Sequence, residues 1–470
     1  MAPRPDPEVR ARLASLPKVD RVLDVAALAE HRAGRALKLR AVQERLGALR
    51  EALLRGESSD APPTAEALAI QVVAELDAIL RPRPRAVLNA TGIVLHTNLG
   101  RAPMGGAVVD AIVEAAGACD LELDLDSGAR GSRFAHLRPL LAAVVGAEDV
   151  HVVGNGAAAL LLACTALGAP GGVVLSRGQM IEIGDSFRVA EMAAAGGARI
   201  WEVGATNRTH RRDYARALDG ALPGQPAPAS AILWAHRSNF RQEGFVCEVA
   251  LGELAQLARE RGVPLIADLG SGSLGAGVPG DEPTITAYLE AGVDVVSCSG
   301  DKLFGGPQAG ILAGRGALIE RLRRHPMARA LRPGKLTVAA LHATIAAHAC
   351  DDAATQLGLH RLVAQTPAQL RERAEAITRA LAWPAAAIRP TAAAIGGGSL
   401  PGETIEGLAV ALPRGFGRGS ASAQARALRR GVRGAPPVIG RIVDDELLLD
   451  LRSLPPESDA ALLDALRRLA

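Results

Sequence analysis

A lysine in a polar turn carries the clearest chemical signal in the sequence. Lys302 ends the segment SCSGDK (297–302), where an apolar run typical of a buried strand gives way to Ser, Gly and Asp. A lysine at a strand end, in a site with little water, can have a lowered pKa and form an imine. Pyridoxal phosphate enzymes need such a lysine, so we interpret Lys302 as the residue that holds this cofactor. A surface lysine in a turn is the simpler alternative.

Lysine is rare in this chain, which strengthens that interpretation. The 470 residues include 53 basic side chains, of which 49 are arginine and four are lysine: Lys18, Lys38, Lys302 and Lys335. An ordinary surface cation would therefore be expected as arginine. Imine chemistry requires a primary amine, which arginine cannot supply.

Two other segments supply groups that the same cofactor would need. The segment IADLGSG (266–272) indicates a buried strand ending in Asp268, whose carboxylate can pair with a protonated ring nitrogen. The segment VGNGAAA (153–159) indicates a strand leading into a helix, where backbone N–H groups can bind a phosphate. A helix-capping aspartate and an ordinary strand–helix turn are the alternatives for each segment alone. The predicted cofactor-binding residues are Lys302, Asp268, Asn155, Gly156, Ala157 and Ser299.

A rival nucleotide-binding motif is present without its context. Residues 270–275, GSGSLG, match the GxGxxG pattern of dinucleotide-binding folds after a strand. That pattern should open directly into a helix, whereas the segment AGVPGDEP (276–283) is typical of a turn. We therefore predict no dinucleotide cofactor.

The cysteine content and the charge limit the classes of protein to which the chain could belong. The five cysteines are dispersed without a CxxC pair, which argues against a zinc or redox motif and favours a cytoplasmic location. The longest uncharged run, 152–176, is broken by Gly and Pro, so we predict no membrane span. The net charge of +3 lies wholly in residues 1–60, which hold 12 basic and 9 acidic side chains. A solvated helical surface or a polyanionic partner would each explain this excess.

The order of the predicted elements indicates an α/β fold. Residues 9–55 and 65–80 have the periodicity of helices. Beyond residue 86, short apolar strands alternate with Ala/Leu-rich helices, which is the pattern of a mainly parallel sheet covered on both faces. The seven expected strands are 151–153, 173–175, 199–203, 231–236, 264–269, 293–299 and 310–314.

Helices dominate after about residue 330, followed by strands expected at 408–413 and 446–451. This change indicates a smaller α+β region at the C-terminal end. The predicted domains are a helical N-terminal domain (1–60), a linker (61–85), a large cofactor-binding domain (86–330) and a small C-terminal domain (331–470).

Several motifs resemble those of one known family, the bacterial selenocysteine synthases, which are L-seryl-tRNA(Sec) selenium transferases. The most specific are LNATGIVLHTNLGRAPM (88–104) and SGDKLFGGPQAGIL (299–312). Further matching stretches are LPKVDRVL (16–23), LELDLDSGARGSR (121–133), SRGQMIEIGDSFR (176–188), EVGATNRTH (202–210), HRSNFRQEGF (236–245) and HPMARALRPGKLT (325–337). The resemblance covers nearly the full chain.

This resemblance implies a fold, a reaction and a set of site residues. The family is similar to pyridoxal phosphate enzymes of the aspartate-aminotransferase type (fold type I), with a helical N-terminal domain that binds tRNA. Its reaction converts L-seryl-tRNA(Sec) to L-selenocysteinyl-tRNA(Sec) with selenophosphate, by elimination through an aminoacrylyl-tRNA and selenium addition. A homodecameric ring of dimers is implied as well. The resemblance assigns catalytic or donor-binding roles to Lys302, Asp301, Arg101, Arg329, Arg332 and Arg133.

Two other functions remain open on the residues alone. A pyridoxal phosphate lyase acting on a free amino acid or amino sugar would share the Lys302 site, but it would not require the helical N-terminal segment. A tRNA-binding protein without catalysis would not need Lys302 in an intact SGDK–GGPQAG setting. His236 is one candidate for stacking on the cofactor ring.

Overall fold

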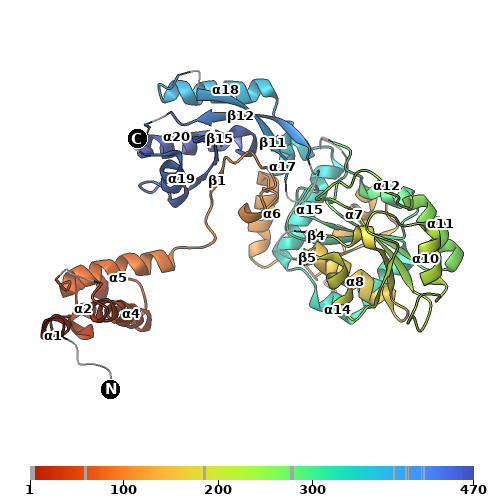
Figure 1. Ribbon diagram of the computed structural model, residues 1–470, viewed down its shortest axis with the longest axis horizontal. Helices are drawn as coiled ribbons and strands as arrows, with labels where there is room; N and C mark the ends of the chain where they lie inside the picture. The colour runs from red at the N-terminus through yellow and green to blue at the C-terminus, as the bar shows by residue number, and fades with distance from the viewer. Residues whose placement is uncertain are drawn as a thin grey trace. The chain divides into compact units, whose positions relative to one another are not determined.

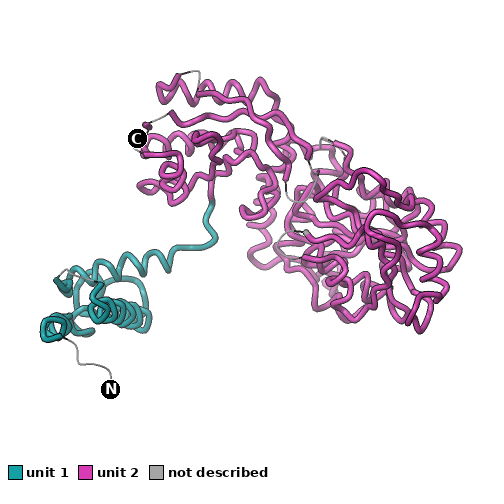
Figure 2. Tube along the Cα trace, in the orientation of Figure 1, with its two compact units in different colours: residues 1–86 teal, residues 87–470 magenta. Residues whose placement is uncertain are grey.

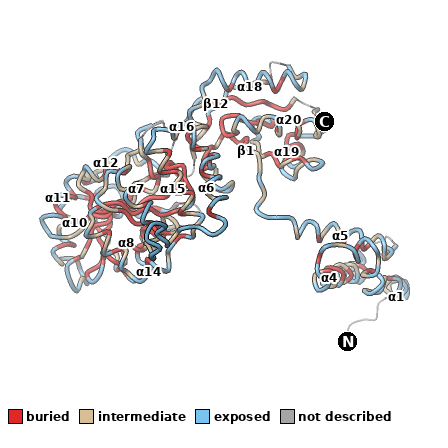
Figure 3. The backbone as a smooth tube through the Cα atoms, turned by 180° about the vertical axis from the view of Figure 1, so that it is seen from behind, coloured by how far each residue is buried: buried red, intermediate tan, exposed pale blue. Residues whose placement is uncertain are grey.

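The structure is a computed structural model in which the chain forms two compact units, residues 1–86 and 87–470 (Figure 2). The described residues are 6–57, 61–183, 187–275, 280–384, 387–396, 400, 402–413, 415–416 and 419–470. Each unit buries an apolar core of its own, visible as the red segments of Figure 3. In this described part of the chain, no helix is both long and apolar enough to cross a membrane.

The N-terminal unit is helical. Its helices are α1 (Pro7–Ala14), α2 (Val19–Leu23), α3 (Ala26–Ala29), α4 (Arg35–Leu54) and α5 (Ala65–Leu80). Val42 and Leu46 of α4 share one core with Val72 and Leu76 of α5, because residues four apart lie on the same face of a helix. The predicted boundary at residue 60 differs from this arrangement, since α5 falls inside the predicted linker yet belongs to the core of the N-terminal unit.

Lys38 has a structural role in this unit. Its side chain is 9% exposed, and its Nζ donates a hydrogen bond of 2.7 Å to the carbonyl oxygen of Ala29 at the end of α3. A cation is favoured there because the carbonyl groups at a helix C-terminus carry partial negative charge. One of the four lysines therefore stabilises a helix end.

The second unit is built on the seven-stranded sheet that the sequence predicts (Figure 1). Its strands are β2 (Asp149–Val153), β3 (Val173–Ser176), β6 (Ile200–Val203), β7 (Ala231–Ala235), β8 (Leu265–Gly270), β9 (Val295–Ser299) and β10 (Gly310–Gly314). They lie in the order β2-β10-β9-β8-β7-β3-β6. Only β10 runs antiparallel to its neighbours, so the prediction of a mainly parallel sheet is confirmed.

Helices cover both faces of this sheet. One face packs against α7 (Leu137–Val145), α10 (Arg211–Leu218), α11 (Leu251–Arg261), α12 (Ile285–Glu290) and α15 (Lys335–Ala349). The opposite face packs against α8 (Gly156–Gly168), α9 (Val189–Ala194), α13 (Gly316–Arg324) and α14 (Pro326–Ala330). The strands read as continuous apolar runs because both of their faces are buried. Since α15 packs on this sheet, the large domain continues past the predicted boundary at residue 330.

A second, antiparallel sheet follows in the chain. Its strands lie in the order β11 (Ile388–Ala394), β12 (Thr404–Ala411), β15 (Glu446–Asp450) and β14 (Arg441–Val443). They share a core with α18 (Pro367–Ala380), α19 (Ala421–Arg430) and α20 (Asp459–Leu469). The strands β12 and β15 confirm the two that were expected in this part of the sequence. The remaining elements include β1 (Leu88–Asn89), β4 (Glu182–Ile183), β5 (Phe187–Arg188), β13 (Val438–Ile439), α6 (Gly106–Ala116), α16 (Ala353–Gln356) and α17 (Gly358–Ala364).

Arg452 joins this second sheet to α17. Its side chain is only 3% exposed. Its Nε donates to the carbonyl oxygen of Glu406 on β12 at 2.8 Å, and its Nη1 donates to the carbonyl oxygens of Leu362 and Gln365 at 3.1 and 2.6 Å. One buried guanidinium therefore satisfies carbonyl groups from two separate parts of the chain.

Replacing Arg452 by leucine should lower the free energy of unfolding by about 3 kcal/mol, because it leaves several buried carbonyl groups without a donor. Arg361→Leu is the matched control. Arg361 forms an ion pair of 3.0 Å with Glu457 at the surface, and losing such a pair costs about 1 kcal/mol or less. Denaturant unfolding followed by circular dichroism measures both changes, and equal losses would contradict this role for Arg452.

Candidate active site

Lys302 lies in the turn segment 300–309 between β9 and β10, with 6% of its surface exposed. The turn is held by backbone hydrogen bonds, among them Gly300 N–H to Ala309 O and Gly306 N–H to Gly300 O, each at 2.8 Å. Burial lowers the pKa of the Lys302 amine, and the nearby Asp268 carboxylate opposes that shift. A lowered pKa increases the fraction of neutral amine, the nucleophilic form.

Asp268 occupies the adjacent strand β8 and faces the same region. Its Oδ1 accepts a hydrogen bond of 2.8 Å from the hydroxyl of Ser297, the residue opposite it on β9. Burial raises the pKa of Asp268, while Ser297, Lys302 and His236 each act to lower it. The Ser297 hydroxyl thus helps to keep a partly buried carboxylate ionised.

A glycine with a positive φ lies beside the lysine, at an irregularity of this strand. The register between β8 and β9 shifts between Asp268 and Gly270. Gly270 has a φ of 73°, and a Cβ atom there would lie 3.8 Å from the Nζ of Lys302. The bulge therefore places the amine beside the end of β8, within the electrostatic influence of Asp268.

The predicted phosphate turn lies at the start of α8. The side chain of Asn155 caps this helix by accepting a hydrogen bond of 2.8 Å from the N–H of Ala158. The N–H groups of Gly156 and Ala157 precede the first intrahelical bonds, so they are available to an anion. A Cβ atom at Gly156 would collide with the hydroxyl of Ser299, so the helix start and the end of β9 are in close contact.

The strand β10 explains how these distant segments meet. Gly310 is opposite Val153 of β2 on one side and opposite Ser299 of β9 on the other. A Cβ atom at Gly310 would collide with the carbonyl oxygen of Asn155. The structure therefore brings together Asn155 and Ser299, which are far apart in the sequence.

Asp301 and Arg101 form an ion pair next to the lysine. The distance from Arg101 Nη1 to Asp301 Oδ2 is 3.0 Å, and Asp301 is 5% exposed. The second carboxylate oxygen, Oδ1, is buried and has no hydrogen-bond partner among the described residues. Arg101 also acts to lower the pKa of Lys302. The predicted residues Asp301 and Arg101 therefore lie beside Lys302.

The other three predicted arginines gather in a separate pocket of about 270 Å³, which we call the arginine pocket. Its charged and polar lining includes Glu122, Arg130, Arg133, His151, Arg323, Arg329 and Arg332. A hydrogen bond of 2.9 Å from Gly154 N–H to Leu331 O connects its Arg329–Arg332 segment to the phosphate turn. The predicted catalytic residues thus form two groups, and this backbone contact connects the second group to the phosphate turn.

Glu122 is a residue of this pocket that the sequence reasoning missed. Its Oε1 accepts from Arg133 Nη2 at 2.9 Å and lies 3.5 Å from Arg332 Nη1, while its Oε2 accepts from Arg130 at 3.0 Å. The hydrogen bonds of Arg133 and Arg130 lower the pKa of Glu122. Only the family-like stretch around it, 121–133, drew attention to this segment, and no spacing rule links Glu122 to Arg332.

His236 lies at the end of β7, where the sequence reasoning left it as a candidate. Its backbone N–H donates to Asp268 O at 2.9 Å. Its ring Nδ1 lies 3.3 Å from Tyr288 Oη, within hydrogen-bond distance, and its Nε2 lies 3.6 Å from Glu282 Oε1. The backbone of His236 is thus bonded to the Asp268 strand, and its stacking role stays a prediction.

Lys335 lies outside the Lys302 turn. It begins α15, and its Nζ donates to the carbonyl oxygens of Ala116, at 3.0 Å, and Gly117 at the end of α6. This is a helix-capping contact like that of Lys38.

Comparison with known proteins identifies the family of the chain. A family model described as SelA, L-seryl-tRNA selenium transferase, matches residues 87–455. A protein named L-seryl-tRNA(Sec) selenium transferase from Methylocella silvestris is 43% identical over 460 residues, which covers 95% of each chain. The protein of the same name from Moorella thermoacetica is 44% identical over 396 residues, covering 81% of each chain.

Among solved structures, D-glucosaminate-6-phosphate ammonia-lyase is similar in fold, with a TM-score of 0.57. The two chains are 22% identical, and the match covers 84% of this chain and 97% of that one. At this identity the similarity concerns the fold alone.

Gly156→Ala should weaken the affinity for pyridoxal phosphate by about tenfold or more, because its methyl group must displace the Ser299 hydroxyl at the phosphate turn. Gly154→Ala is the matched control, since its methyl group would lie 3.6 Å from Leu331 O, an ordinary contact. Titration of each protein with the cofactor, followed by absorbance, compares the two. Equal affinities would contradict this assignment of the turn.

Proposed function

The chain belongs to the SelA family of L-seryl-tRNA selenium transferases, and we propose that it converts L-seryl-tRNA(Sec) to L-selenocysteinyl-tRNA(Sec) with selenophosphate as donor. The observation that carries this proposal is the buried Lys302 beside Asp268, in a chain related to these enzymes over almost its full length. The enzyme is a transferase of selenocysteine biosynthesis.

Pyridoxal phosphate is the cofactor, and the residues fit it. Lys302 provides the buried amine that would hold it, and Asp268 provides a partly buried carboxylate for its ring nitrogen. The N–H groups of Gly156 and Ala157, with the Ser299 hydroxyl beside them, suit its phosphate. When bound, the cofactor supplies an electron sink for the bond broken at the seryl Cα.

Residues of the chain would transfer the protons and hold the charge that the reaction needs. Once the amine of Lys302 is free, it can take the proton from the seryl Cα, because its lowered pKa favours the neutral base. Asp301 is held beside it by Arg101 and can share in proton transfer to the departing hydroxyl. Asp268 keeps its negative charge with the help of the Ser297 hydroxyl.

The donor is a small oxyanion, which planar guanidinium groups bind better than ammonium groups do. Arg329 and Arg332 of the arginine pocket and Arg101 beside Lys302 are the proposed donor ligands, with Arg133 in support. Glu122 contacts Arg133 and Arg332 in the structure, so an incoming oxyanion would compete with this carboxylate.

The charge of the N-terminal unit suits a tRNA partner. The excess of basic over acidic residues in 1–60 suits a phosphate backbone. The helical N-terminal unit is the proposed tRNA-binding domain. The proposed assembly of the whole protein is a decameric ring of dimers. The five free cysteines support a cytoplasmic location.

Purified protein should convert Ser-tRNA(Sec) with selenophosphate, and free serine should give no turnover. Lys302→Ala should reduce the rate by about a thousandfold or more, because both the covalent attachment point and the base are lost. Arg426→Ala, which removes an exposed cation of α19 outside the N-terminal unit, should keep the activity. Turnover of free serine alone would favour a lyase instead.

Borohydride reduction and peptide mapping should place the cofactor on Lys302, and label on Lys335 would contradict the site.

Replacing the exposed arginines Arg21, Arg35 and Arg50 of the N-terminal unit by alanine should weaken tRNA binding and its salt dependence. Each lost phosphate contact lowers the slope of log affinity against log salt by about one. The matched control replaces three exposed arginines of α19, Arg426, Arg429 and Arg430. Filter binding over a salt series measures both, and an unchanged slope in the first variant would exclude these three contacts.

A further inference from the structure

His151 is a buried polar side chain without a hydrogen-bond partner among the described residues. It is the middle residue of β2 and is 4% exposed. Neither Nδ1 nor Nε2 has a hydrogen-bond partner among the described residues. Native proteins nearly always satisfy such groups, and an exception calls for a role or a bound molecule.

The ring of His151 lines the arginine pocket. Phe134, which lines the same pocket, contacts the imidazole edge-on, with ring centroids 5.9 Å apart and an interplanar angle of 88°. Burial, with Arg323 and Arg138 nearby, lowers the pKa of His151 to about 4. At neutral pH the ring is therefore uncharged and offers one N–H donor and one nitrogen lone pair.

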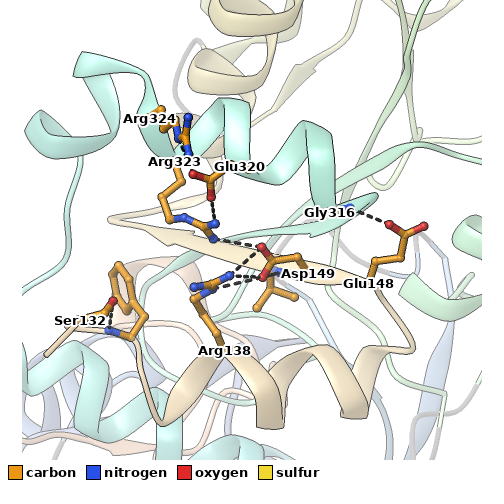
Figure 4. Close-up of polar contacts among 10 residues, drawn as sticks. Ser132, Arg138, Glu148, Asp149, Gly316, Glu320, Arg323 and Arg324 are labelled. Atoms are coloured by element: carbon orange, nitrogen blue, oxygen red, sulfur yellow. Dashed lines mark hydrogen bonds and ion pairs between the residues drawn. The ribbon is translucent and has the colours of Figure 1, made fainter. Parts of the chain in front are cut away.

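Much of the positive charge around this ring already has a partner. Figure 4 shows Arg138 and Arg323 converging on Asp149, with Nη2–Oδ2 at 2.7 Å and Nη1–Oδ2 at 3.0 Å respectively. Arg323 also contacts Glu320. These carboxylates hold Arg323 at one side of the pocket, close to the imidazole.

The remaining charge of the pocket is only partly balanced. Arg130, Arg133 and Arg332 share the single carboxylate of Glu122. Arg329 has no ion-pair partner among the described residues, although it lines the same pocket. The pocket therefore has an excess of positive charge, and its volume of about 270 Å³ suits a small anion rather than a nucleotide.

We propose that His151 is a further ligand of the small phosphate-like oxyanion that the arginine pocket binds. Its N–H donates to one oxygen of the anion, and this donor adds no charge to a site already rich in arginine. The guanidinium groups supply attraction, while the fixed imidazole supplies a directional contact. That the anion is the selenium donor rests on the proposed function; the anion site itself does not.

The test uses inorganic phosphate as the probe and the full-length holoenzyme. Calorimetric titration should show saturable phosphate binding to the wild type, and His151→Leu should weaken it by about tenfold or more, since a hydrogen bond to a charged group is lost. His342→Leu is the matched control, because His342 is a half-buried histidine on α15 outside this pocket. It should bind phosphate like the wild type.

Stability separates a ligand role from a structural one. Because His151 has no hydrogen-bond partner among the described residues, leucine should leave the melting temperature unchanged or raise it. His151→Asn, which retains an amide N–H, should recover part of the affinity, and it tests the proposal even if the leucine variant does not fold. In turnover assays, His151→Leu should raise KM for selenophosphate more than it lowers kcat.

Two outcomes would overturn the inference: no saturable phosphate binding to the wild type, or wild-type affinity in both His151 variants. Phosphate binding that depends on His151, in an enzyme that does not use selenophosphate, would leave this anion site standing and reject the proposed donor. The failure of one proposal is thereby distinguishable from the failure of the other.

Discussion

The central constraint on this structure is the burial of an amine and a carboxylate at one edge of a sheet. Removing Lys302 and Asp268 from water disfavours the charged form of each, and their mutual attraction offsets part of that cost. Neighbouring polar groups and a local backbone irregularity accommodate this pair. Ser297 donates to Asp268, and Gly270 adopts the positive φ that the irregular end of β8 requires. The local sequence of β8 and β9 follows from that requirement.

The reversed strand β10 extends this site across the sheet. It returns directly after the Lys302 turn and inserts between β9 and β2, which places the start of α8 next to the end of β9. Gly310 makes the insertion possible, because any side chain there would strike the Asn155 carbonyl. The segments that would bind the cofactor are about 150 residues apart in the sequence. The strand β10, with Gly310 at its start, brings them together.

Much of this could be predicted from local sequence, since it depends on local chemistry. All seven strands appeared as buried apolar runs, and Lys302 and Asp268 appeared as polar groups at strand ends. Their pairing with Ser297 depends on register, which apolar runs do not specify. The assignment of Arg329 and Arg332 came from family resemblance, because arginine is too common here to be informative. The contact of Glu122 with Arg332, across 210 positions, exists only in the folded chain.

The two helix-capping lysines have a practical consequence for chemistry performed on the protein. Lys38 and Lys335 each engage backbone carbonyl groups, and Lys302 is enclosed. Of the four lysines, all within the described residues, Lys18 is the exposed one without a hydrogen bond. An amine-directed fluorophore or tether should therefore attach to side chains selectively at Lys18, on the N-terminal unit. The scarcity of lysine makes the chain nearly single-site for bioconjugation, with the reactive position far in sequence from the catalytic amine.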